Sequence, residues 1–211
     1  MFYDALKNDH GLPHDPMNAL VTPRPIGWIS SVGRDGTRNL APYSFFNLVA
    51  SKPPIVVFGS AFVKDTQRNI EETGEFVCNV ANWELREAVN ASSVESPPDV
   101  DEFDFTGLEA AESRLVRAPR VKRAMAALEC KYVQTVPLPS ATDAPHFFSL
   151  VIGRVVGVYI DDAVIRDGRV DVTLIRPLAR LGYLDFSVVN EVFAMPRPPR
   201  IEAAVAQPVQ A

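Results

Sequence analysis

The chain has 211 residues, 47% of them hydrophobic and 22% charged, a balance typical of one globular domain whose core needs no disulfide or metal. Its 26 acidic and 21 basic side chains give a net charge of −5, which argues against nucleic acid or an anionic membrane as the main partner. Because no apolar run approaches the roughly 18 residues of a membrane span and the N-terminus lacks a signal pattern, we expect a cytoplasmic protein.

The first half of the chain is predicted to form short strands around one longer helix. Four prolines make the first 25 residues irregular. A helix is predicted over Asp65–Thr73, capped by Asp65 or Thr66 and ended by Gly74. A shorter helix is predicted over 84–91. Strands are predicted at 26–32, 37–40, 44–49, 55–60 and 76–80, with a turn at 33–36 between the first two.

The second half begins with a change in composition. Pro, Asp and Glu with isolated apolar residues over 96–119 predict a long surface excursion that serves function or covers a partner. Strands are predicted at 128–136, 147–160 and 170–174, the last after a turn at 166–168. The end of the chain is expected to be frayed beyond about residue 200. Many short strands with few helices indicate an all-β barrel with added helices.

The predicted strand 147–160 is apolar on both of its faces. Alternate residues of a strand point to opposite sides, so both faces of this strand must be covered. The inside of a barrel covers one face, and either a helix or a second subunit covers the other. We favour a dimer interface on the outer face.

Other chemical motifs have little support in the sequence. The dinucleotide, P-loop and nucleophile-elbow glycine motifs are absent. Cys78 and Cys130 lie in apolar strand-like runs and are predicted to be buried and unpaired. His10 and His14 lie close to two aspartates, but in a stretch predicted to be irregular, so we expect no metal site there.

Three stretches carry groups that suit a ligand. Residues 28–31 place Ser30 and Ser31 at the end of an apolar strand. Residues 39–47 are aromatic and interrupted by Pro42, which leaves backbone groups free for the polar edge of a ring. Residues 64–69 start a helix with Lys64 and Thr66, which suits a phosphate.

Each of these stretches also agrees with ordinary structure: strand serines that face solvent, aromatic core packing, and a capped surface helix. Taken together they describe a planar ligand with a polar edge and a terminal phosphate. FMN fits that description, and so do other nucleotides.

The same stretches resemble the flavin reductase family, which includes flavoredoxin-like proteins. The resemblance covers roughly residues 15–182 in the expected order, and we treat 1–211 as a single domain with a C-terminal extension at 183–211. The matching motifs are 23–30, 39–47, 64–69, 74–79, 101–103, 107–108, 118–121, 128–130, 153–156 and 177–182.

The resemblance implies a fold, a dimer and a binding site. The fold is mainly β, a six-stranded antiparallel FMN-binding split barrel (Greek key) with a few short peripheral helices. Two subunits form a homodimer with one FMN each near the interface. The residues that the resemblance assigns to flavin binding are Trp28, Ser30, Ser31, Ala41, Pro42, Tyr43, Ser44, Phe45, Phe46, Asn47, Lys64, Asp65 and Thr66.

Within that set the resemblance assigns the phosphate to Ser30, Ser31, Lys64 and Thr66, and the isoalloxazine to 41–46, with Asn47 beside it. It also suggests His146 as a residue near the nicotinamide or flavin, although a histidine at the start of a strand is more often structural.

The function implied is transfer of hydride from NADH or NADPH to flavin by positioning of two rings. Reduced flavin would pass to a partner monooxygenase or another acceptor. Two alternatives stay open: an FMN-binding barrel without NAD(P)H activity that uses its flavin on another substrate or as an electron carrier, and a non-enzymatic interaction module. The sequence does not decide between NADH and NADPH, or between bound cofactor and released flavin.

Overall fold

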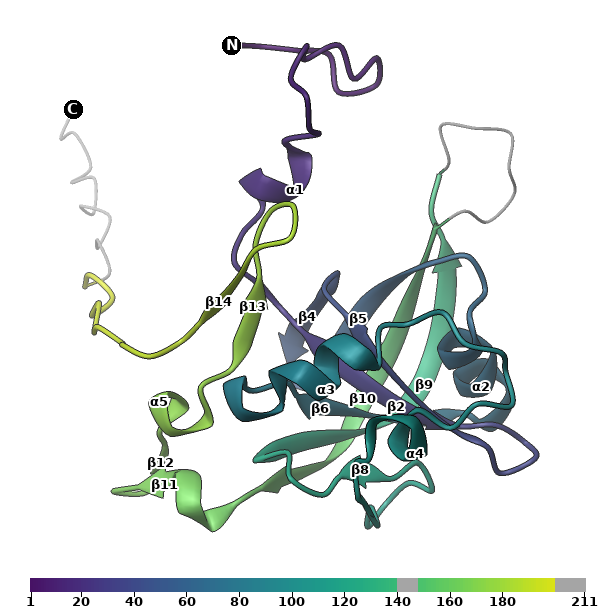
Figure 1. Ribbon diagram of the computed structural model, residues 1–211. Coiled ribbons are helices and arrows are strands. Elements are labelled where there is room, and N and C mark those ends of the chain that lie inside the picture. The colour runs from purple at the N-terminus through teal and green to yellow at the C-terminus, as the bar shows by residue number, and fades with distance from the viewer. Residues whose placement is uncertain (140–147, 200–211) are drawn as a thin grey trace, which may run out of the picture.

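The computed structural model describes residues 1–139 and 148–199, and an antiparallel sheet of seven strands lies at its centre (Figure 1). The predicted mainly β class is confirmed. The sheet has seven strands rather than the six expected from the resemblance. In order across the sheet they are β3 (Arg38–Tyr43), β2 (Gly27–Val32), β6 (Glu75–Val80), β9 (Ala126–Pro137), β10 (Phe148–Ile160), β5 (Pro54–Ala61) and β4 (Phe46–Ser51).

The two edge strands of this sheet follow one another in the chain. Only Ser44 and Phe45 separate β3 from β4, although these strands end opposite sides of the sheet. The sheet therefore curls until its two edges meet, and we call the junction at Ser44 and Phe45 the seam. The Gly59 N–H donates to the Phe45 carbonyl at 2.7 Å and fixes the seam to β5. Pro42 lies in β3, an edge strand, where a residue without an N–H is tolerated.

Alternate residues of β2 point into two separate hydrophobic cores. Ile29 packs in the core that contains Phe58 and Phe76. Gly153 of β10 is needed there, because a Cβ at this position would lie 2.3 Å from the Phe76 ring. Trp28 packs in a second core, which includes residues of the helices that cover β2 and β3. One short strand therefore holds the sheet and its helical cover together.

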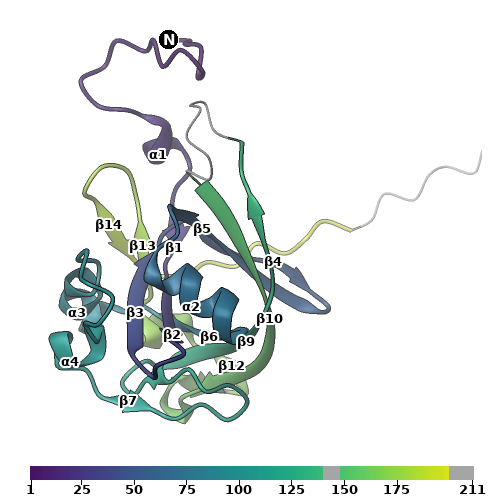
Figure 2. The same ribbon diagram turned by 90° about the vertical axis from the view of Figure 1, so that its right-hand side faces the viewer.

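The longest helix lies against β2 and β3 (Figure 2). Helix α2 (Asp65–Thr73) has the predicted bounds and ends at Gly74, which takes the left-handed conformation with φ 76°. The predicted cap is wrong: Lys64 occupies the N-cap position and no side chain caps the helix. The remaining helical turns are short: α1 (Met17–Leu20), η1 (Trp83–Leu85), α3 (Arg86–Ala91), α4 (Glu102–Thr106), η2 (Asp162–Val164) and α5 (Val172–Ile175).

The stretch 96–119, predicted to be a surface excursion, is fastened to the sheet. It contains α4 and β7 (Ala110–Ala111), which pairs with β8 (Arg120–Val121). Phe103 of α4 is fully buried in the second core. Glu129 of β9 accepts hydrogen bonds from the backbone N–H groups of Arg114 and Leu115 at 2.9 and 2.6 Å. The polar composition of this stretch is visible in the sequence, but the sheet residue that binds its backbone, Glu129, could not be identified there.

The rest of the chain forms two small sheets. Strands β1 (Arg24–Pro25), β13 (Leu178–Arg180) and β14 (Phe186–Val188) form one, so the C-terminal extension contributes a strand. Strands β11 (Ile165–Arg166) and β12 (Arg169–Val170) flank the predicted turn. The predicted strand 170–174 is wrong, because Asp171 accepts from the Thr173 N–H at 3.0 Å and starts α5 instead.

Among the residues that the structure describes, strand β10 is well covered on one face only. Ser149, Val151 and Val155 are buried, whereas Val156 and Val158 on the other face are 36% and 61% exposed. The predicted two-sided apolar character is therefore present, and the outer face lies open in the single chain.

Candidate functional site

A cavity of about 420 Å³ lies at the seam, beside the start of α2. We call it the seam pocket. Strand β3, the end of β5 and the loop 92–96 form its other walls. Eight residues that the sequence assigns to flavin binding line it: Ala41, Pro42, Tyr43, Ser44, Phe45, Lys64, Asp65 and Thr66. Two stretches 20 residues apart in the sequence thus meet at one cavity.

The other assigned residues do not line the seam pocket. Ser30 and Ser31 are fully buried, and the Ser30 hydroxyl donates to the Pro119 carbonyl at 2.5 Å. Trp28 is also buried, and its Nε1 donates to Ser92 Oγ at 2.9 Å, so it supports a residue that lines the pocket. Phe46 packs in the first core and Asn47 is exposed on β4. His146 lies outside the described residues.

A buried hydrogen-bond network joins three walls of the seam pocket. Thr66 Oγ1 donates to Asn39 Oδ1 at 2.6 Å, and Asn39 Nδ2 donates to Glu102 Oε2 at 2.9 Å. The second carboxylate oxygen of Glu102 accepts from Ser96 Oγ at 2.6 Å. The Leu40 N–H also donates to Glu102, at 3.0 Å. The network fixes the first turn of α2 against β3 and the segment 96–119.

Asn39, Ser96 and Glu102 line the pocket but were not assigned to it from the sequence. Asn39 begins the aromatic stretch 39–47, and Glu102 lies in the matching motif 101–103, so both were near recognised motifs. No spacing rule connects Glu102 with Asn39, because 63 residues separate them. Only the fold shows that they share a wall.

Tyr43 forms part of the pocket floor as a neutral phenol. Its side chain is buried, and burial raises the pKa of its hydroxyl, although hydrogen bonds with Thr66 and Ser60 act in the opposite direction. The ring packs at 4.6 Å from that of Phe58 in the first core. Tyr43 therefore offers a rigid apolar surface rather than a charge.

The start of α2 is the natural place for an anion in the seam pocket. With no side-chain cap, the backbone N–H groups of its first turn remain available, and the partial positive charge of the helix end adds to them. Lys64 is the one cation among the described lining residues, and it lies 3.5 Å from Glu95. Asp65 is paired with Arg68, which offsets its charge.

A second region of the pocket, along β3, suits a planar ring with a polar edge. Strand β3 is hydrogen-bonded on one side only, so alternate backbone N–H and C=O groups point away from β2. Leu40 uses such a group to reach Glu102. A ligand with a ring, a flexible chain and a phosphate, as FMN has, matches these two regions of the cavity in chemistry and in size.

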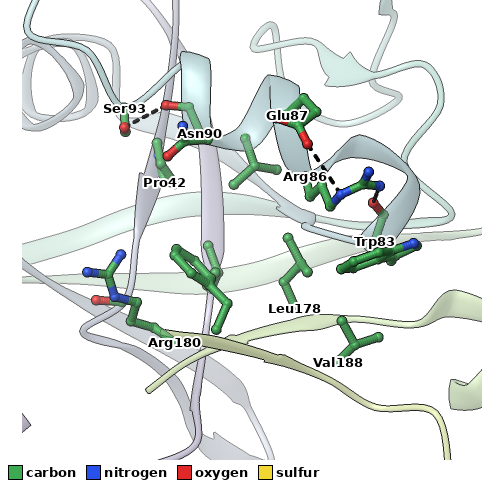
Figure 3. A pocket seen from close by; sticks show the side chains of 13 residues that line it. Pro42, Trp83, Arg86, Glu87, Asn90, Ser93, Leu178, Arg180 and Val188 are labelled. Carbon is green, nitrogen blue, oxygen red and sulfur yellow. Dashed lines mark hydrogen bonds and ion pairs between the residues drawn. The ribbon is translucent and has the colours of Figure 1, made fainter. Parts of the chain in front are cut away.

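A second cavity of about 340 Å³ adjoins the seam pocket and shares Pro42, Ser44 and Ser93 with it. We call it the side cleft (Figure 3). Helix α3 and the pair β13–β14 form its other walls, with Trp83, Arg86 and Arg180 at its edges. This cleft could not be predicted from the sequence, because its walls come together from three distant parts of the chain.

Groups for other kinds of chemistry are not assembled in the described part of the chain. Cys78 and Cys130 are buried and form no disulfide, as predicted, and burial and contact with Cys130 raise the pKa of the Cys78 thiol. Among residues 1–139 and 148–199, no group of three or more His, Cys, Asp or Glu side chains could hold a metal ion.

Comparison with known proteins gives one family and several relatives. Residues 17–178 match the family described as flavin reductase like domain. An uncharacterized protein of Aquifex aeolicus is 36% identical over 169 residues, which cover 77% of this chain and 83% of that protein.

Two solved structures are also similar. Nitrilotriacetate monooxygenase component B from Bacillus cereus has a TM-score of 0.83 and 29% identity, covering 92% of this chain and 98% of that chain. The 2-nitrobenzoate 2-nitroreductase NbaA of Pseudomonas fluorescens has a TM-score of 0.78 and 28% identity, covering 89% and 91%. The similarity in structure confirms the predicted split-barrel class.

Proposed function

The chain belongs to the flavin reductase like domain family, whose chemistry is that of flavin-related oxidoreductases, and from that premise we propose that it binds FMN in the seam pocket and passes hydride to it from NADH or NADPH. One observation carries the proposal. The seam pocket is lined both by the uncapped start of α2, beside Lys64, and by β3, an edge strand that is hydrogen-bonded to a neighbouring strand on one side only. These two features suit the phosphate and the ring of one ligand.

The residues of this chain would bind and orient the flavin, and the flavin would supply the hydride chemistry. Lys64 and the first turn of α2 would hold the phosphate. The backbone of 41–45 would run along the polar edge of the ring, and Tyr43 would support its plane. The network of Thr66, Asn39 and Glu102 keeps these two regions at a fixed separation.

The decisive experiment is anaerobic reduction of the FMN-loaded protein. Purified protein with one equivalent of FMN is mixed with NADH and, separately, with NADPH, and the visible flavin absorbance is followed. Rapid bleaching with either nucleotide is the expected result and identifies the preferred donor. Bound flavin that stays oxidised with both would overturn the reductase proposal and leave an FMN-binding barrel.

A second subunit is part of the proposal. The outer face of β10 exposes Val156, Val158 and Ile160, and the edge strand β4, separated from β10 by β5, exposes Leu48 and Val49. A patch of this kind is typical of an interface between copies of a chain. We expect a homodimer in analytical ultracentrifugation and a monomer for Val158→Asp. A wild-type monomer at micromolar concentration would contradict this part.

The acceptor of the electrons is also proposed by analogy. The similar structure from Bacillus cereus is a monooxygenase component, which supports delivery of reduced flavin to a partner monooxygenase. The similarity to NbaA, a reductase of an aromatic compound, supports the alternative that bound flavin acts directly on an organic substrate. Retention of FMN through gel filtration after reduction would favour the alternative, and release would favour delivery. In the described chain no helix is long and apolar enough to cross a membrane.

A further inference from the structure

The walls of the side cleft combine aromatic rings with guanidinium groups. Arg86 lies over the Trp83 ring, 4.1 Å from its centroid, and Arg180 lies 4.6 Å from the centroid of Phe186. Figure 3 shows Trp83 and Arg180 at opposite ends of the cleft with Leu178 between them. The cleft therefore has apolar side chains between two arginines, with Asn90 and Ser93 adding polar groups to its wall.

The charge at one end of the cleft is not balanced by the protein. Arg86 is paired with Glu87 at 3.3 Å, whereas Arg180 forms no ion pair with any carboxylate of the described chain. Its guanidinium donates only to the neutral carbonyl of Tyr183. One end of the cleft is compensated by a carboxylate and the other is not.

A second guanidinium lies close to Arg180. In the β1–β13 pair Arg24 stands directly opposite Arg180, an arrangement of like charges that destabilises a sheet. Arg24 is buried, and it donates to the carbonyls of Asn18, Val21 and Leu181, which carry no charge. Its Nε has no hydrogen-bond partner among residues 1–139 and 148–199, and burial and the charge of Arg180 lower its pKa. An anion beside Arg180 would relieve this repulsion.

We propose that the side cleft binds a planar aromatic carboxylate, with its ring along Leu178 and the Trp83 and Phe186 side chains and its carboxylate paired with Arg180. The aromatic walls offer stacking, and the Arg180 guanidinium, which has no carboxylate partner in the described chain, offers a charge-assisted hydrogen bond to a carboxylate. A volume of about 340 Å³ holds one or two fused rings and is too small for a whole nicotinamide dinucleotide.

The position of the cleft gives this ligand its role. Pro42, Ser44 and Ser93 form a wall common to the cleft and the seam pocket, so the ligand would lie next to the ring end of the flavin site. The inference that the ligand is a substrate or a regulator of the flavin reaction rests on the proposed function. The inference that the cleft binds an aromatic carboxylate does not, because it depends on the residues of the cleft alone.

The test uses two probes of similar shape, one anionic and one neutral. The full-length protein, with and without FMN, is titrated with 2-naphthoate and with the neutral 2-naphthamide by isothermal titration calorimetry. We expect 2-naphthoate to bind both forms and 2-naphthamide to bind about tenfold more weakly, as loss of a charge-assisted pair predicts. Binding should also quench tryptophan emission in the wild type and not in Trp83→Leu, which places the ring at Trp83.

Variants locate the anion. Arg180→Gln should remove the preference for 2-naphthoate over 2-naphthamide, while Arg169→Gln, at an exposed arginine of β12, should retain it. Thermal melting shows whether Arg180→Gln is folded. If it is not, the two probes on the wild-type protein and the Trp83→Leu quenching still decide the proposal.

Three results would overturn it: equal affinity for both probes, an unchanged preference in folded Arg180→Gln, or displacement of FMN by 2-naphthoate, which would make the cleft part of the flavin site. Failure of FMN itself to bind would instead contradict the proposed function. The titration of the FMN-free protein would then decide the cleft by itself.

Discussion

The two buried carboxylates that fasten the segment 96–119 to the sheet have different partners. At the seam pocket Glu102 accepts hydrogen bonds from Asn39, Ser96 and the Leu40 N–H, all of them uncharged donors. At the far end Glu75 of β6 pairs with Arg117 at 2.8 Å and with Lys131 at 2.5 Å. Both carboxylates are almost fully buried. Arg38 of β3 also pairs with Asp101 and Asp104 next to Glu102, so ion pairs fasten the segment at both ends. The difference lies in the two buried carboxylates: that of Glu102 has only uncharged partners, whereas that of Glu75 is held by two cations.

The largest effect is expected from breaking the neutral network. Asn39→Leu removes a donor to buried Glu102 and the acceptor of the Thr66 hydroxyl, so we expect a loss of about 3 kcal/mol in the free energy of unfolding, measured by urea denaturation, and weaker FMN binding. Asn47→Leu, at an exposed position of β4, is the control and should change stability by less than about 0.5 kcal/mol. Equal losses would show that the network is not stabilising.

The ion pairs of Glu75 should make the free energy of unfolding depend on pH. Burial pushes the pKa of Glu75 upward, but hydrogen bonds from Lys131 and Arg117 outweigh burial and hold the pKa below its ordinary value of 4.5. A carboxyl with a lowered folded pKa contributes stability above its unfolded pKa and loses it as the pH falls through the folded value. Unfolding free energy should therefore fall below pH 4.5 more steeply in the wild type than in Glu75→Gln.

The control for this acid titration is Glu112→Gln, at an exposed carboxyl in the same segment. Its stability curve should parallel that of the wild type. A Glu75→Gln curve that also runs parallel to the wild type would show that the ion pairs at the far end add no pH-dependent stability.

A smaller effect concerns the phosphate. Lys64→Gln should weaken FMN binding about fivefold, the size expected for a half-exposed ion pair, and leave riboflavin binding unchanged because riboflavin has no phosphate. Fluorescence titration with both flavins measures this difference. Lys52→Gln, at an exposed lysine of the β4–β5 turn, serves as the matched control. Equal loss for both flavins would place the phosphate elsewhere.

The smallest effect should be a gain. Glu95 competes with a phosphate for Lys64 at 3.5 Å, and its side chain is 89% exposed. Glu95→Gln should strengthen FMN binding about twofold at low salt, and the gain should disappear at high salt. Glu72→Gln, which removes an exposed carboxylate that pairs with Arg34 on the far side of α2, should have no such effect. Unchanged affinity of Glu95→Gln would show that Lys64 is already free.

Most of the barrel could be predicted from the sequence because its signals are local. Alternation of apolar residues located the strands, and Gly74 ended α2 where a left-handed residue is needed. The wrong predictions of the strand 170–174 and of the cap of α2 also have local causes. Asp171 started a helical turn in a run of β-branched residues. Lys64, not Asp65 or Thr66, took the N-cap position, so the first turn stays uncapped.

The candidate site was predicted in part. Residues 41–45 and 64–66 line the seam pocket, because the features that bring them there, a proline at a strand edge and the start of a helix, are written in short stretches. Ser30 and Ser31 carry the right groups, but β2 is an interior strand of the sheet and buries them.

The sequence by itself determined three features of the candidate site and its surroundings: a proline in an aromatic edge strand, a helix start beside Lys64, and a strand that is apolar on both faces. The tertiary structure alone decided that Glu102 reaches Asn39 across 63 residues and that β14 closes a second cleft against α3. The physical reason is the distance along the chain over which each effect acts. Backbone preferences act over a few neighbouring residues, whereas a cavity is formed by side chains whose meeting depends on how the whole sheet curls.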